Sequence, residues 1–219
     1  MTPKTDAQIQ EQVIRELKWD TRVDATDIGV AVHRGTITLT GAVNSWAKKL
    51  AALEAAHRVA GVLDVANDIE VKLPGDLKLD DTAIAQAVRQ ALKWSVLVPD
   101  DRIQSTVSTG MVTLDGEVDF WTEYEDAERA VHNLAGVCGV RNRIRIQPSK
   151  IAHDVRNSIQ EALERHTERE VQHIGLSVRE GVVELSGKVR SWAEKQAVLG
   201  ATKGTKGVRF IDDHLSIEP

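Results

Sequence analysis

The residues of this 219-residue chain that could do chemistry are seven histidines, one cysteine and several adjacent acid pairs. A protease-type zinc site needs two histidines four residues apart on one helix, and His153, His166 and His173 lack that spacing. Cys138 has no second cysteine with which to form a disulfide or a metal-binding pair. The sequence therefore predicts no metal site and no cofactor.

The acid pairs are poorly placed for general acid–base catalysis, which needs carboxylates held against a reacting group. Three such pairs occur: Asp80–Asp81, Asp100–Asp101 and Asp212–Asp213. They fall where helices are expected to begin or strands to end, and carboxylates there commonly cap helices or face solvent. His57 and His132 are equivalent in an internal repeat, but Lys203 takes the third position. We therefore predict no catalytic residues and a protein that is not an enzyme.

The net charge of −5 argues against nucleic-acid binding, because that affinity comes from many lysines and arginines on phosphate. The acidity is concentrated in residues 76–148, which hold eight Lys or Arg against twelve Asp or Glu. No apolar stretch approaches the roughly 20 residues that span a bilayer, so we expect no transmembrane segment. The first residues show no basic region followed by an apolar run, which predicts no signal peptide or lipobox and a cytoplasmic protein.

One short stretch occurs three times, as "GAVNSWAKK", "GEVDFWTEY" and "GKVRSWAEK". A shift of 75 residues lays the second copy on the first, and a further shift of 71 lays the third on the second. Glycines and tryptophans coincide in this register: Gly35/Gly110/Gly181, Gly41/Gly116/Gly187, Gly61/Gly136/Gly207 and Trp46/Trp121/Trp192. Such self-similarity indicates three copies of one structural unit.

Each unit has the pattern helix, strand, strand, helix, strand. Apolar residues recur at three- and four-residue spacing in the first helix and alternate with polar residues in the strands. The first shared glycine falls at a tight hairpin turn, the second near a strand end and the third at a helix C-cap, so we expect all nine glycines to determine the fold. The sequence predicts an α+β protein of three tandem αββαβ modules, over residues 6–73, 80–147 and 149–219. Each should be a three-stranded mixed sheet with two helices on one face.

The unit resembles the BON domain. The resemblance rests on "GTITLTGAV…AGVLDVANDIEV", "GMVTLDGEV…AGVCGVRNRIRI" and "GVVELSGKV…KGVRFIDDHLSI". It implies a non-enzymatic protein associated with osmotic and envelope stress that binds phospholipid membranes or other ligands. Several relatives are periplasmic or lipid-anchored, and a cytoplasmic branch includes potassium binding. The expected partner is thus an anionic phospholipid surface, with a protein-interaction scaffold and a potassium sensor as alternatives.

The repeated tryptophans are the candidate contact residues. Trp46, Trp121 and Trp192 fall in the first turn of the second helix, after N-caps such as Ser45 and Ser191. They can either pack the helix against the sheet or a neighbouring module, or enter a lipid headgroup region or a partner's pocket. Nearby lysines suit anionic lipid in the first and third copies: Lys48, Lys49, Lys188 and Lys195.

The second copy has acidic residues at that helix start, namely Glu123, Glu125 and Asp126, which oppose anionic lipid. Another tryptophan pair, Trp19 and Trp94, is shared by the first two copies only. We interpret that pair as a local packing feature or a contact between modules.

Overall fold

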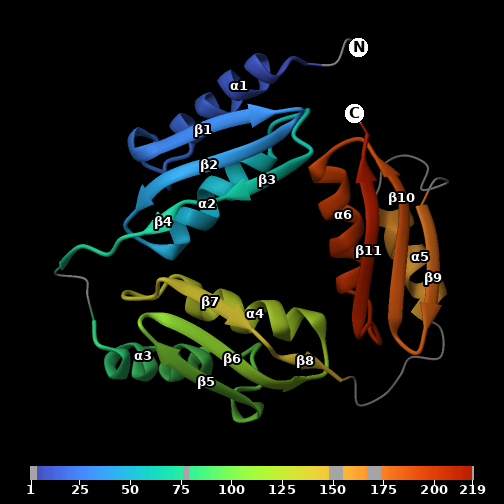
Figure 1. The fold of residues 1–219 in the computed structure, drawn as a ribbon. Helices are drawn as coiled ribbons and strands as arrows, with labels where there is room; N and C mark the ends of the chain where they lie inside the picture. Colours follow the sequence, from blue (N-terminus) through green and yellow to red (C-terminus); the bar gives the residue numbers. More distant parts are fainter. Residues whose placement is uncertain (1–3, 76–78, 148–154, 167–173, 219) are drawn as a thin grey trace.

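The computed structural model describes residues 4–75, 79–147, 155–166 and 174–218, and within them it contains three α+β modules (Figure 1). Module 1 comprises α1 (Asp6–Trp19), β1 (Ile28–His33), β2 (Thr36–Val43), α2 (Trp46–His57), β3 (Asp64–Asn67) and β4 (Glu70–Val71). Module 2 comprises α3 (Asp81–Trp94), β5 (Ile103–Ser108), β6 (Met111–Val118), α4 (Trp121–His132), β7 (Gly139–Asn142) and β8 (Arg145–Ile146). Module 3 comprises α5 (Val155–His166), β9 (Ile174–Arg179), β10 (Val182–Val189), α6 (Trp192–Lys203) and β11 (Phe210–Ile217). The predicted αββαβ order is confirmed.

The sheet of each module is mixed. The middle strand, β2, β6 or β10, pairs antiparallel with the strand before it and parallel with the strand that follows the second helix. In modules 1 and 2 that last strand is interrupted, so that β3 and β4, or β7 and β8, pair with the same middle strand. In module 3 it is the continuous strand β11. This topology places the two helices of a module on one face of its sheet.

Each module buries its own apolar core between helices and sheet. In module 1, Val13 and Leu17 of α1 meet Ala52 and Ala55 of α2 over Leu39 of β2. Corresponding clusters fill modules 2 and 3. The small alanines on the inner face of α2 allow that helix to approach the sheet closely. The modules are therefore three cores rather than one, as the repeat predicts.

A carboxylate in the first turn of the first helix holds the hairpin turn of modules 1 and 2. The Asp6 carboxylate accepts from the N–H groups of Arg34 and Gly35 at 2.8 and 3.0 Å. These bonds to the charged form lower the pKa of Asp6. Both turn residues have positive φ, 50° and 77°, which a tight two-residue hairpin turn requires. Asp81 binds Thr109 and Gly110 in the same way in module 2.

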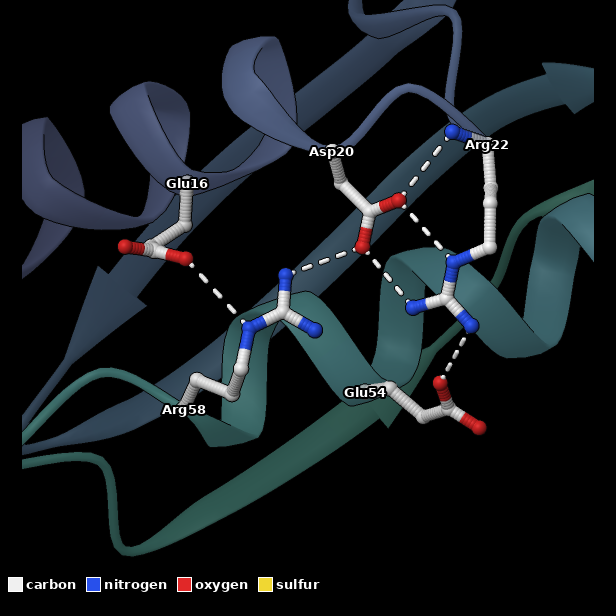
Figure 2. A network of polar contacts seen from close by, with 5 residues as sticks. All are labelled: Glu16, Asp20, Arg22, Glu54 and Arg58. Carbon is white, nitrogen blue, oxygen red and sulfur yellow. Dashed lines mark hydrogen bonds and ion pairs between the residues drawn. The ribbon is translucent and has the colours of Figure 1, made fainter.

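The end of α1 carries an ion network (Figure 2). The Asp20 carboxylate, whose side chain is only 7% exposed, pairs with Arg22 at 2.8 Å and Arg58 at 2.9 Å. Arg22 also pairs with Glu54, and Arg58 also pairs with Glu16. Hydrogen bonds from Arg22 and Arg58 hold the pKa of Asp20 far below its usual range. The network ties the C-terminal end of α1 to α2.

The glycine in the middle strand of modules 1 and 2 approaches the backbone of the preceding segment closely. Gly41 has φ of 116°, and a Cβ there would overlap the carbonyl oxygen of Asp27. Gly116 has the same relation to Arg102. The remaining predicted fold glycines also have positive φ: Gly35, Gly61, Gly110, Gly136, Gly181, Gly187 and Gly207. The predicted C-cap role of the third glycine was wrong, because the C-caps are Arg58, Asn133 and Gly204 and the glycine lies in the turn after each of them. A side chain at Gly41 therefore meets a rigid backbone group rather than a flexible neighbour.

We expect Gly41→Ala to lower the free energy of unfolding by about 2 kcal/mol or more, because it combines overlap with strain at positive φ. Denaturant titration measures the change. Gly200→Ala is the matched control, since Gly200 lies within α6 and an added Cβ meets no atom within 4 Å. That control should be stabilising by up to about 1 kcal/mol. Equal effects of the two substitutions would contradict the close-approach argument.

Candidate functional site

The helix-start tryptophans lie at the junctions between modules. Trp46 begins α2 of module 1, yet its side chain packs against the core of module 2. Trp121 begins α4 of module 2 and packs against the core of module 3. The indole of Trp46 also lies near Gly139, the first residue of β7. Each of these two indoles therefore forms a packing contact between its own module and the next one in the chain.

Trp192 makes the third junction, from module 3 back to module 1. Its indole stacks on the imidazole of His57, with ring centroids 3.8 Å apart and planes 8° from parallel. Successive contacts therefore run from module 1 to 2, from 2 to 3 and from 3 to 1. Figure 1 shows the three modules placed around a common centre, as this closed order of contacts requires.

The residue that receives the tryptophan lies in the last turn of the second helix. His57 receives Trp192 in module 1, and Lys203 lies over the ring of Trp121 at 5.7 Å in module 3. Lys203 also pairs with Glu125 of module 2 at 2.8 Å. His132, the equivalent residue of module 2, is close enough to feel the charge of Glu54 in module 1. The repeat register already places His57, His132 and Lys203 at equivalent positions, but the sequence alone suggested for them only a catalytic role, which the lysine excluded.

Burial favours the neutral form of both His57 and His132. It lowers the pKa of His57, although Asp64 acts in the opposite direction. It likewise lowers the pKa of His132, against Glu128 and Glu54. At the third junction a neutral His57 imidazole stacks on the indole of Trp192 without the cost of desolvating a cation.

Three ring nitrogen atoms of the junction residues have no hydrogen-bond partner in the described part of the chain. Trp46 Nε1, Trp121 Nε1 and His57 Nδ1 are buried and have no hydrogen-bond partner among the residues that the structure describes. An unpaired buried donor costs roughly 1–3 kcal/mol. Because that cost opposes assembly, apolar and aromatic contact must supply the stability of the junctions.

The predicted lipid-facing lysines have intramolecular contacts. Lys49 lies over the Trp46 ring and donates to the carbonyl oxygen of Ile69 at 2.7 Å. Lys195 lies over Trp192, donates to Leu215 and pairs with Asp213 at 2.9 Å. Each lysine therefore contacts the helix-start tryptophan of its own module.

The other two predicted lysines differ from each other. Lys188 is exposed and pairs with Glu218 at 2.8 Å. Lys48 is half-buried at the start of α2, where its N–H donates to the Ser45 hydroxyl. Ser45 and Ser191 are N-caps, as predicted.

Trp19 and Trp94 are exposed, so their interpretation as packing or junction residues was wrong. Their exposed fractions are 76% and 75%. In module 2 the exposed surface continues through Val96 at 98% and Leu97 at 67%. We call Trp94, Val96 and Leu97 the α3 tip. Sequence reasoning missed Val96 and Leu97, although two adjacent apolar residues in a loop after an expected helix are a detectable pattern.

Features of catalysis and metal binding are scarce. Among the described residues no group of three His, Cys, Asp or Glu side chains could hold a metal ion, while His153 and His173 lie outside them. Burial raises the pKa of the half-buried Cys138 thiol, which disfavours the thiolate. Within the same described ranges, no helix is long and apolar enough to cross a bilayer.

Three αββαβ modules, each with a glycine-turned hairpin and a helix-start tryptophan, define the class of protein. The BON domain model matches residues 5–72, 80–148 and 152–219, which is most of the chain. The chain therefore belongs to the BON domain family.

The chain is similar to the Osmotically-inducible protein Y of Escherichia coli (strain K12). The two are 28% identical over 144 residues, which is 64% of this chain and 72% of that protein. Two solved structures of CdsD, a structural protein of the Type III secretion system of Chlamydia trachomatis, align at 13% identity and a TM-score of 0.27. One alignment covers 97% of this chain and 93% of the other, and the CdsD C-terminal domain alignment covers 99% and 100%. The low TM-score gives these two alignments no weight.

We expect Trp121→Ala to lower the free energy of unfolding by about 2–4 kcal/mol, because it removes an indole from the core of the neighbouring module. Guanidinium titration measures the loss, and small-angle scattering should show a larger radius of gyration. Trp19→Ala is the matched control, because this indole is exposed, and its effect should stay within about 0.5 kcal/mol. A junction role for Trp121 is rejected if the two variants are equally stable.

We expect the junction at His57 to weaken in acid. The folded-state pKa of His57 lies below its ordinary value of 6.5, so the folded protein binds fewer protons than the unfolded chain. The contribution of this residue to the free energy of unfolding is therefore complete above pH 6.5 and declines as the pH falls toward the folded-state value. His57→Phe keeps the stack and should reduce this pH dependence. Thermal unfolding of both proteins between about pH 7.5 and pH 5 measures it; parallel curves would disprove the assignment.

Proposed function

We propose that this protein is a non-enzymatic, stress-associated binding protein that attaches to phospholipid membrane surfaces through the α3 tip. The observation that carries the proposal is the exposure of Trp94, Val96 and Leu97 in one short segment. Large exposed apolar clusters on soluble domains mark surfaces that contact membranes or partners. A tryptophan beside aliphatic side chains suits the boundary between headgroups and acyl chains.

Module 1 provides an internal comparison for the α3 tip. The positions of Ser95 and Leu97 are occupied there by Asp20 and Arg22, the centre of the ion network in Figure 2. Module 1 also exposes a tryptophan at this helix end, Trp19, but the residues that follow it form ion pairs, whereas Val96 and Leu97 of module 2 are exposed and apolar. Because the fold accepts both versions, the fold itself does not require the exposed Val96 and Leu97.

Charge predicts how the α3 tip binds. Module 2 is the acidic part of the chain, although Lys93 lies directly beside Trp94. A strong attraction to anionic lipid is therefore not expected, and the affinity should come mainly from apolar insertion. Added salt should consequently weaken binding only slightly.

The remaining candidate contacts depend on the junctions. Trp46, Trp121 and Trp192 are packed between modules, so lipid or a protein partner could reach their rings only if a junction opened. The α3 tip needs no such opening. The association with osmotic stress is supported by the similarity to Osmotically-inducible protein Y.

The test is tryptophan emission during titration with vesicles of phosphatidylcholine and of phosphatidylcholine with phosphatidylglycerol. We expect a blue shift on vesicle addition, because Trp94 moves from water into the interface, and little change with sodium chloride. Leu97→Arg, which installs the module 1 residue, should weaken vesicle binding about tenfold. The matched control is Leu63→Ser, which alters an exposed apolar residue of module 1 and should bind as before.

Absence of binding to either vesicle, or equal binding by Leu97→Arg, would overturn the membrane assignment. In the first case the α3 tip would be the surface with which to search for a protein partner. A potassium-binding role is tested in the same samples by comparing the unfolding temperature in potassium and in sodium buffer.

A further inference from the structure

A groove of about 1040 Å³ lies at the junction between modules 2 and 3. Its module 2 wall is formed by α4 and by the segment from Asn142 to Gln147, and its module 3 wall by the β9–β10 turn and the start of β11. Four arginines line it, two from each module: Arg143, Arg145, Arg179 and Arg209. Such a concentration of guanidinium groups is unusual in a chain of net charge −5.

Most of this positive charge is uncompensated. Arg145 pairs with Glu117 at 2.7 Å. Across the described ranges, Arg143, Arg179 and Arg209 form no ion pair. Among the described residues that line the groove, Glu180 is the single acidic one. The groove thus combines like charges from two modules, which repel one another when no anion is present.

The other two junctions show that a junction does not need these arginines. In the repeat register, the first junction has Asp68, Glu70, Ser108 and Cys138 at the four positions. The third has His214, Ser216, His33 and Leu63. All three junctions contain the helix-start tryptophan, but only the second brings four arginines together. Assembly of the modules therefore does not explain them.

Apolar and aromatic side chains also line the groove. Trp121 and Tyr124 contribute from α4, and Phe210, which is 56% exposed, contributes from β11. Burial raises the pKa of the Tyr124 hydroxyl, which keeps it as a hydrogen-bond donor. The groove therefore offers guanidinium groups for an anion beside an apolar surface for the rest of a ligand.

We propose that this groove binds a phosphate ester that carries an apolar portion. The planar guanidinium groups match phosphate oxygens in paired hydrogen bonds, and the aromatic side chains accept the apolar part. The groove is a separate site from the α3 tip, and the proposal does not depend on vesicle binding there. The same chemistry occurs in the headgroup of an anionic lipid and in a soluble phosphate ester.

The test is calorimetric titration of the full chain with dihexanoyl phosphatidic acid as a monomer. Dihexanoyl phosphatidylcholine and glycerol 3-phosphate are the comparison ligands, because one lacks the net negative charge and the other lacks the acyl chains. We expect phosphatidic acid to bind about tenfold or more tightly than either comparison ligand. The double variant Arg179→Gln/Arg209→Gln should lose this binding by a similar factor of about ten.

Arg141→Gln is the matched control. Arg141 is exposed on β7, close in sequence to Arg143, but it does not line the groove. Circular dichroism verifies that the variants fold. Equal affinity for the three ligands, or unchanged phosphatidic acid binding by the double variant, would overturn the proposal.

Vesicles containing phosphatidic acid distinguish the two sources of ligand. Competition by vesicles, retained in Leu97→Arg, would support a lipid headgroup as the occupant. Binding of the monomer without competition by vesicles would support a soluble phosphate ester. Loss of vesicle binding in Leu97→Arg with normal monomer binding would separate the α3 tip from the groove.

Discussion

The indole at the start of the second helix of each module belongs to the packing of another module, and the arrangement of the whole chain depends on this contact. Trp46 and Trp121 complete the cores of modules 2 and 3, and Trp192 stacks on His57 of module 1. The contact buries indole and imidazole nitrogens that have no partner in the described part of the chain. The junctions must therefore be stabilised by shape and apolar contact, which hold only while the modules stay closely packed.

A closed order of three contacts has a consequence for stability. Each module is attached to both of the others, so opening one junction does not release a module. Once two junctions are made, the third forms between surfaces that are already close, which reduces its entropic cost. The residues that contact the indoles differ: His57 stacks on Trp192, whereas Lys203 lies over Trp121 and pairs with Glu125. These two junctions should therefore respond differently to pH and salt.

Repetition allows the modules to be compared with one another. The first helix ends in an exposed tryptophan in both modules, but the next residues form the Asp20 ion network in module 1 and are the exposed Val96 and Leu97 in module 2. The junction groove is rich in arginine between modules 2 and 3 and has acidic or neutral residues at the same positions between modules 1 and 2. The same backbone fold accommodates both sets of residues at the helix end and at the junction. The fold therefore requires neither version.

The sequence by itself determined the module and its number. Three local patterns carry this information: glycine where φ is positive, apolar residues that alternate along strands, and apolar residues at helical spacing. Because each pattern occurs three times in one register, the repeat confirms it. The interpretation of Trp46, Trp121 and Trp192 remained divided between packing and exposure, and that of Trp19 and Trp94 was wrong. Periodicity places a residue on a face of its helix, but it does not show whether another module covers that face. Only the tertiary structure decided this, because Trp46 meets Gly139, Trp192 meets His57 and four arginines meet across a junction through contacts between residues far apart in the chain.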